Sequence, residues 1–177
     1  DTIWAIIRTA LQDNPSVKVN LDLENTTGLT SIEPSSFAVC RSLTRVVIPE
    51  GVTEIGHAAF HGCSSLESVV IPKSVTTIRE YAFYDCRSLT SIVIPEGVTE
   101  IGMVAFSYCD SLTRVEIPEG VTTIGEGAFC DCSSLESVII PKSVTEIGGA
   151  AFSRCDSLTN VEILEGVTKI GDSAFDG

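Results

Sequence analysis

The stretch CDSLTRVEIPEGVTTIGEGAFCD, residues 109–131, is one unit of a repeat that runs through most of the chain. Phenylalanine, cysteine and leucine each recur every 23 residues. The recurring positions are Phe37, Phe60, Phe83, Phe106, Phe129, Phe152 and Phe175; Cys40, Cys63, Cys86, Cys109, Cys132 and Cys155; and Leu43, Leu66, Leu89, Leu112, Leu135 and Leu158. A fixed short period predicts a solenoid, because one unit cannot bury its apolar face until a neighbour stacks on it.

The first half of the unit predicts a β-strand with one buried face. Leu112, Val115 and Ile117 are apolar, and the polar Glu116 alternates with the last two. Pro118 has no N–H to give to a sheet, so we expect the strand to stop at Ile117. The equivalent residue is proline in four other units and leucine in the last: Pro49, Pro72, Pro95, Pro141 and Leu164.

The second half of the unit predicts another extended segment on the opposite wall of the coil. Val121 and Ile124 point inward, and the segment is rich in β-formers and too short for a helix. The glycine that follows is replaced once by Arg79, so we expect no positive φ to be required there. Ala128 and Phe129 then close the turn, with the aromatic ring filling the coil interior.

The two ends of the chain depart from the repeat. In residues 1–28 we expect an N-terminal cap: a helix capped by Thr2 and ended by Pro15, followed by a strand from Val17 to Leu23. Residues 29–177 are predicted to form about six to seven coils, and we expect the C-terminal cap to be missing. An open last coil exposes strand edges and favours self-association.

Composition limits the function classes. The net charge of −13 argues against a nucleic-acid partner, because phosphate binding relies on Lys and Arg. It also argues against an anionic membrane surface. No apolar run is long enough to insert into a membrane, and no leader peptide is visible. A cytosolic protein and a mature fragment both remain compatible with this sequence.

The cysteines form a column. Six of the seven occupy one position of the repeat, which predicts reduced, buried side chains that act as small hydrophobes with a weak S–H donor. Cys130 lies outside the column at a variable position, and we expect it to be exposed.

No enzyme chemistry is predicted, and neither a metal nor a cofactor. His57 and His61 have no fixed acidic or thiol partner. Cys130 and Cys132 lack the spacing of a zinc-binding pair. Nothing in the chain combines a nucleophile, a base and an oxyanion donor.

The pattern I-P-x-x-V-x-x-I-G-x-x-A-F-x-x-C, over residues 29–177, resembles the repeat of BspA-like (Treponema-type) leucine-rich repeat proteins. The resemblance implies a mainly β solenoid with a parallel β-sheet and an N-terminal helical cap. It also implies an extracellular or cell-surface location and adhesion to a protein, such as a host matrix or cell-surface protein. The near-identity of the repeats fits either recent duplication or consensus design.

Two surfaces are candidates for partner binding. The first is the outward face of the strands, with an apolar ridge of valines; plain β-propensity explains the ridge equally well. Its residues are Thr44, Arg45, Val47, Ser68, Val70, Ser91, Val93, Arg114, Glu116 and Ile139. The second is the variable edge around each Ala-Phe pair, which includes Tyr84 and Tyr108. Neutral drift on a solvated rim is the alternative for this edge.

These observations favour a non-enzymatic protein-binding module, of adhesin type, that presents its sheet face and variable edge. The alternatives are an engineered or structural repeat scaffold without a partner, and the recognition domain of a larger surface protein.

Overall fold

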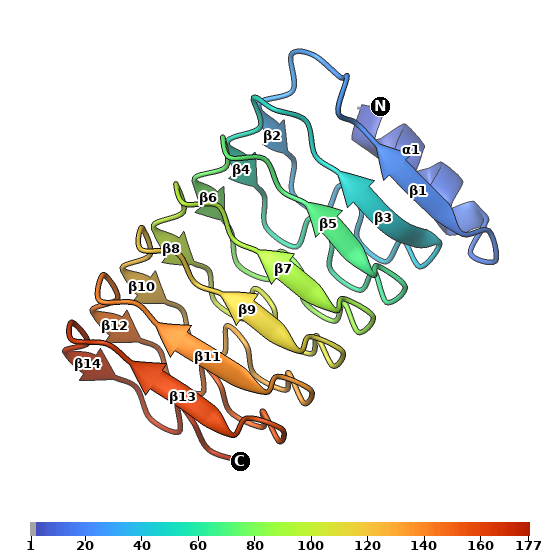
Figure 1. Cartoon of the computed structure of the whole chain (residues 1–177). Coiled ribbons are helices and arrows are strands. Elements are labelled where there is room, and N and C mark those ends of the chain that lie inside the picture. The colour runs from blue at the N-terminus through green and yellow to red at the C-terminus, as the bar shows by residue number, and fades with distance from the viewer. Residues whose placement is uncertain (1–2) are drawn as a thin grey trace.

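The computed structural model describes residues 3–177, which form a β-solenoid of about seven turns with one helix at its N-terminal end (Figure 1). Each coil contributes one strand to each of two walls. The long-strand wall contains β1 (Val19–Asp22), β3 (Leu43–Val47), β5 (Ser68–Val70), β7 (Ser91–Val93), β9 (Arg114–Glu116), β11 (Ser137–Ile140) and β13 (Asn160–Ile163). The short-strand wall contains β2 (Ser31–Ile32), β4 (Glu54–Ile55), β6 (Thr77–Ile78), β8 (Glu100–Ile101), β10 (Thr123–Ile124), β12 (Glu146–Ile147) and β14 (Lys169–Ile170).

The predicted alternation along the strands is confirmed. In the first full coil, Leu43, Val46 and Ile48 are buried, with at most 2% of each residue's surface exposed to solvent. All strand pairs are parallel, and like residues face like across the ladder, as in the pairing of Ile124 with Ile147. The 23-residue period therefore translates directly into columns of identical side chains in one continuous core.

A third wall, the phenylalanine wall, closes each coil. Neighbouring phenylalanine rings lie nearly parallel, at 2–9° and centroid separations of 5.1–5.3 Å, from Phe37 to Phe175. This is the offset-stacked range that aromatic pairs prefer. Between Phe37 and Phe152, each phenylalanine N–H also donates to the carbonyl oxygen of the alanine in the next coil, over 2.7–2.8 Å. The turn is thus a hydrogen-bonded ladder in its own right.

Left-handed residues make this ladder possible. Positive φ angles occur two residues before and two residues after each phenylalanine; around Phe106 they are 47° at Val104 and 59° at Tyr108. Both N–H groups donate to the next coil, to the carbonyl oxygens of Glu126 and Cys130. The sequence did not reveal these columns, because most of their members are not glycine.

The glycine that ends each short strand is explained by close approach of the backbone. None of Gly56, Gly102, Gly125, Gly148 and Gly171 has a positive φ, as predicted. A Cβ at Gly125 would lie 2.7 Å from the carbonyl oxygen of Ile101, and one at Gly148 would lie 2.5 Å from the backbone nitrogen of Glu126. The preference for glycine therefore comes from the backbone of the preceding coil, although one coil accommodates Arg79 at this position.

The cysteine column is buried and hydrogen-bonded. From Cys63 to Cys155, each column thiol donates to the carbonyl oxygen of the phenylalanine one coil earlier, over 3.0–3.4 Å. Burial raises the pKa of the thiols, to about 11 for Cys40 and about 12 for Cys155. The pKa values of the fully enclosed Cys86 and Cys109 are raised further.

Cys130 corrects one expectation, because it is half-buried rather than exposed. Its Sγ atom donates to Oδ2 of Asp131 over 3.2 Å. Burial and this carboxylate raise the pKa of the Cys130 thiol to about 11. The position tolerates different residues, but the turn still covers most of the side chain.

Helix α1 (Ile3–Asp13) covers the first end of the core. Trp4 packs edge-on against Phe37, with ring centroids 5.4 Å apart, and so continues the phenylalanine stack. Ser42 donates its hydroxyl to the carbonyl oxygen of Leu11 over 2.8 Å. Strand β1 occupies only Val19–Asp22 of the predicted segment. The expected capping residue Thr2 lies outside the described residues.

At the other end, β13 and β14 are the edge strands of the two walls within residues 3–177. Val161, Ile163 and Ile170 are 39%, 41% and 52% exposed there.

The long-strand wall is interrupted where the other two walls continue. β5 and β7 are not paired, so the wall divides into a three-stranded and a four-stranded sheet. At the same junction β6 and β8 pair only through Ile78 and Ile101. The phenylalanine wall remains intact, since Phe83 N–H still donates to the carbonyl oxygen of Ala105 over 2.8 Å.

The strained φ angles yield a stability prediction. Val39 has a φ of 61° and is 42% exposed, whereas its equivalent in the next coil is Gly62. Val39→Gly should raise the free energy of unfolding by about 1 kcal/mol, because the left-handed conformation costs glycine nothing. Urea denaturation measures the change. Val93→Gly, in a strand, is the control and should lower stability; an equal loss in both variants contradicts the assignment.

The buried thiols predict a loss of stability at alkaline pH. Unfolded thiols ionise near pH 9 while the folded column keeps its protons, so the folded state binds more protons and stability falls as pH rises from about 9 toward 11. Each thiol contributes about 1.4 kcal/mol per pH unit in that range. Urea denaturation as a function of pH measures this slope. Cys86→Ala with Cys109→Ala should make it shallower, and an unchanged slope contradicts the prediction.

Candidate functional site

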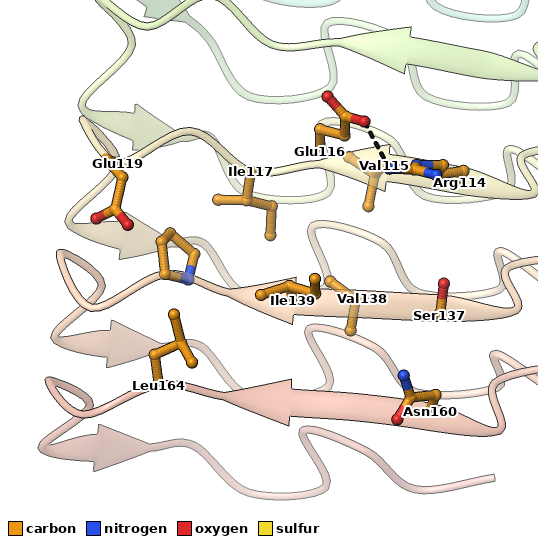
Figure 2. Close-up of a pocket in the computed structure, with 11 residues that line it drawn as sticks. Arg114, Val115, Glu116, Ile117, Glu119, Ser137, Val138, Ile139, Asn160 and Leu164 are labelled. Carbon is orange, nitrogen blue, oxygen red and sulfur yellow. Dashed lines mark hydrogen bonds and ion pairs between the residues drawn. The ribbon is translucent and has the colours of Figure 1, made fainter.

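A groove of about 380 Å³ opens on the outer face of the long-strand wall, across β9, β11 and β13 (Figure 2). Its volume lies in the range of small ligand pockets. The lining residues are Arg114, Val115, Glu116, Ile117, Glu119, Ser137, Val138, Ile139, Pro141, Asn160 and Leu164.

The groove coincides with an incomplete strand pairing. β9 and β11 pair only through Arg114 and Ser137, whereas β11 and β13 pair along all four residues from Ser137 to Ile140. The ladder between these two strands therefore ends at Ser137, and the groove lies beside the unpaired part. On the short-strand wall, β10 and β12 keep both of their pairs, so the opening is confined to one face.

The groove has an apolar floor and rim. Val115, Ile117 and Val138 are almost fully buried and form its floor. Ile139 stands on the rim with 53% of its surface exposed. Leu164 lies at the far end, at the position that is proline in the other five units. This replacement was visible in the sequence, and it is the one sequence signal that marks the groove.

Charged groups border the groove on the β9 side. Arg114 Nη2 lies 2.7 Å from Oε1 of Glu116, as Figure 2 shows. Both side chains are well exposed, so the ion pair adds little stability. Glu119 and Asn160 add polar groups without a further cation. The rim is therefore slightly acidic, in keeping with the net charge of the chain.

Only some of the candidate residues of the strand face line the groove. Arg114, Glu116 and Ile139 line the groove. The remaining candidates that are exposed are Arg45, Val70, Ser91 and Val93, while Thr44, Val47 and Ser68 are half-buried.

The predicted ridge is exposed at Val70 and Val93, whereas Val47 is half-buried. Val47 pairs with Val70 across β3 and β5, but the ladder ends there and Val93 belongs to the other sheet. Thr44 is engaged by the cap, because its Oγ1 donates to Asn20 Oδ1 over 2.8 Å. The sequence pattern could not show this, since it assumes equal pairing at every junction.

Tyr84 and Tyr108 lie away from this face, on the outer side of the phenylalanine wall. Their ring centroids are 5.5 Å apart, so the structure does bring this predicted pair together.

The described residues hold no group of three or more His, Cys, Asp or Glu side chains that could ligate a metal. The contact of His57 Nδ1 with Glu80 Oε2, at 3.9 Å, is exposed. No helix within residues 3–177 has the length and apolarity to cross a bilayer.

Comparison with known proteins agrees with this architecture. The BspA-type leucine-rich repeat region matches in six copies, over residues 18–133 and 53–177. The chain belongs to the BspA-type leucine-rich repeat family. Proteins of this family are repeat proteins, generally non-enzymatic, and consistent with a role in protein interaction. A search of curated proteins found no match.

Three solved structures are similar along most of the chain. The Treponema pallidum leucine-rich repeat protein is 35% identical with a TM-score of 0.77, over 83% of this chain and 69% of that one. A leucine-rich cell surface protein of Faecalibacterium prausnitzii is 36% identical with a TM-score of 0.70, over 85% and 43%. A Bacteroides ovatus leucine-rich repeat protein is 31% identical with a TM-score of 0.65, over 87% and 48%. This chain thus spans less than half of the last two proteins.

Proposed function

We propose that this chain is a non-enzymatic protein-binding module that holds its partner at the groove of the long-strand wall. The observation that carries the proposal is the exposed Ile139 beside an opened ladder with an apolar floor. Apolar anchors in desolvated pockets dominate binding energy at protein interfaces. The groove offers such a pocket on the long-strand wall.

The chemistry of the groove defines the kind of partner segment that fits. Its volume of about 380 Å³ accepts one or two large apolar side chains. Glu116 and Glu119 on the rim, together with the net charge of −13, favour a partner with basic residues next to the apolar anchor.

A surface location and an adhesive role belong to the same proposal. The support is family membership and the similarity to a protein described as a cell surface protein. Because the chain spans only part of its structural neighbours, it also fits the recognition domain of a larger surface protein.

Binding to a panel of purified host matrix proteins, measured by surface plasmon resonance, tests the proposal. Ile139→Lys should weaken binding at least about tenfold, because it replaces an apolar contact on the rim by a cation that repels the basic residues of the partner. The side chain is half exposed, so thermal stability should hardly change.

Val70→Lys is the matched control, since Val70 is 44% exposed on the same wall but lies on β5, away from the groove. Loss of binding in this variant alone would assign the site to the valines instead. No binding to any member of the panel would favour a scaffold without a partner.

A further inference from the structure

All three tyrosines and both histidines of the chain gather in one place, although the repeats are otherwise nearly alike. They lie on the outer side of the phenylalanine wall in three consecutive coils. We call this surface the aromatic ledge; its residues are His57, His61, Tyr81, Tyr84 and Tyr108.

The rings of the ledge touch one another from coil to coil. His57 packs against Tyr81 with centroids 5.4 Å apart, and His61 packs against Tyr84 at 5.2 Å. Tyr84 also contacts Tyr81 at 5.7 Å and Tyr108 at 5.5 Å. The interplanar angles of 56–74° are edge-to-face or tilted, so each ring fixes its neighbour. The ledge is therefore preorganised before any partner arrives.

The fold itself does not need these rings. The position of Tyr84 is serine in two other coils, at Ser107 and Ser153. The position of Tyr108 is glycine at Gly62, and that of Tyr81 is alanine at Ala58 and Ala150. These coils have the same backbone bonds to their neighbours, including those from Ala58 and Gly62. Packing requirements therefore do not account for five aromatic side chains in three coils.

The ledge lies in a negative field. Burial, then Tyr108 and the carboxylate of Asp85, raise the pKa of Tyr84. Asp85 and Asp110 share Arg87, at 2.6 and 3.7 Å, so two carboxylates face one guanidinium. Glu80 lies beside His57 on the same edge. With a chain charge of −13, these groups attract cations rather than anions.

We propose that the aromatic ledge binds a basic segment of a partner protein. Arginine or lysine side chains would lie over the faces of Tyr84 and Tyr108, as in cation–π pairs, while Glu80 and Asp85 supply the opposite charge. This proposal depends on the proposed function only in taking a protein as the partner. The ledge and the groove lie on different walls of the solenoid, so each can be tested without the other.

The test uses a synthetic peptide with arginines separated by Gly-Ser spacers, and a matched peptide in which citrulline replaces each arginine. Tyrosine ring resonances in NMR spectra report on binding, since the chain has no tyrosine outside the ledge. The arginine peptide should shift these resonances, and the uncharged citrulline peptide should not.

The decisive variant combines Tyr84→Ser with Tyr108→Gly, which introduces residues found at the equivalent positions and keeps the net charge. Affinity for the arginine peptide, measured by calorimetry, should fall about tenfold, the effect of removing two exposed cation–π contacts. Val17→Ser, an equally neutral change at a 54% exposed side chain of the cap, is the control and should leave affinity unchanged.

Equal affinity in the double variant would overturn the proposal, because net charge alone would then explain binding. A neutral oligosaccharide that shifts the same resonances more strongly than the arginine peptide would also overturn it, in favour of a sugar site. Either result leaves the Ile139→Lys experiment on the groove unaffected, so failure of the ledge and failure of the proposed function can be told apart.

Discussion

The hydrogen bond from each phenylalanine N–H to the alanine carbonyl of the next coil, beside the stacked rings, fixes the register of the whole solenoid. It is repeated at 2.7–2.8 Å from Phe37 to Phe152, including the junction where β5 and β7 are unpaired. The column thiols from Cys63 to Cys155 reinforce it, because each donates to the phenylalanine carbonyl oxygen one coil earlier. Because these bonds repeat from coil to coil, strand pairing on the long-strand wall can vary without loss of the fold.

Both candidate binding surfaces are departures from this regularity. The groove occurs where the ladder between β9 and β11 is cut short and where Leu164 stands in place of proline. The ledge occurs where small turn residues are replaced by rings such as Tyr84. In a protein whose repeats bury the same columns, such departures are features that can distinguish one partner from another.

The sequence predicted the coils, the strand alternation and the buried columns because these depend on period and polarity alone. It did not predict the residues with positive φ, such as Val104, because most residues at these two repeat positions are not glycine. It overestimated the exposure of Cys130 and of Val47, because both depend on small shifts between nearly identical coils. The sequence signal at the groove was Leu164, which stands where the other units have proline.

Native-state hydrogen exchange tests the central role of the phenylalanine wall most directly. The amides of Phe60, Phe83, Phe106 and Phe129 should exchange only through global unfolding, while amides along the β5–β7 junction should exchange by local opening and much faster. Exchange of the phenylalanine amides as fast as those at the β5–β7 junction would contradict the account.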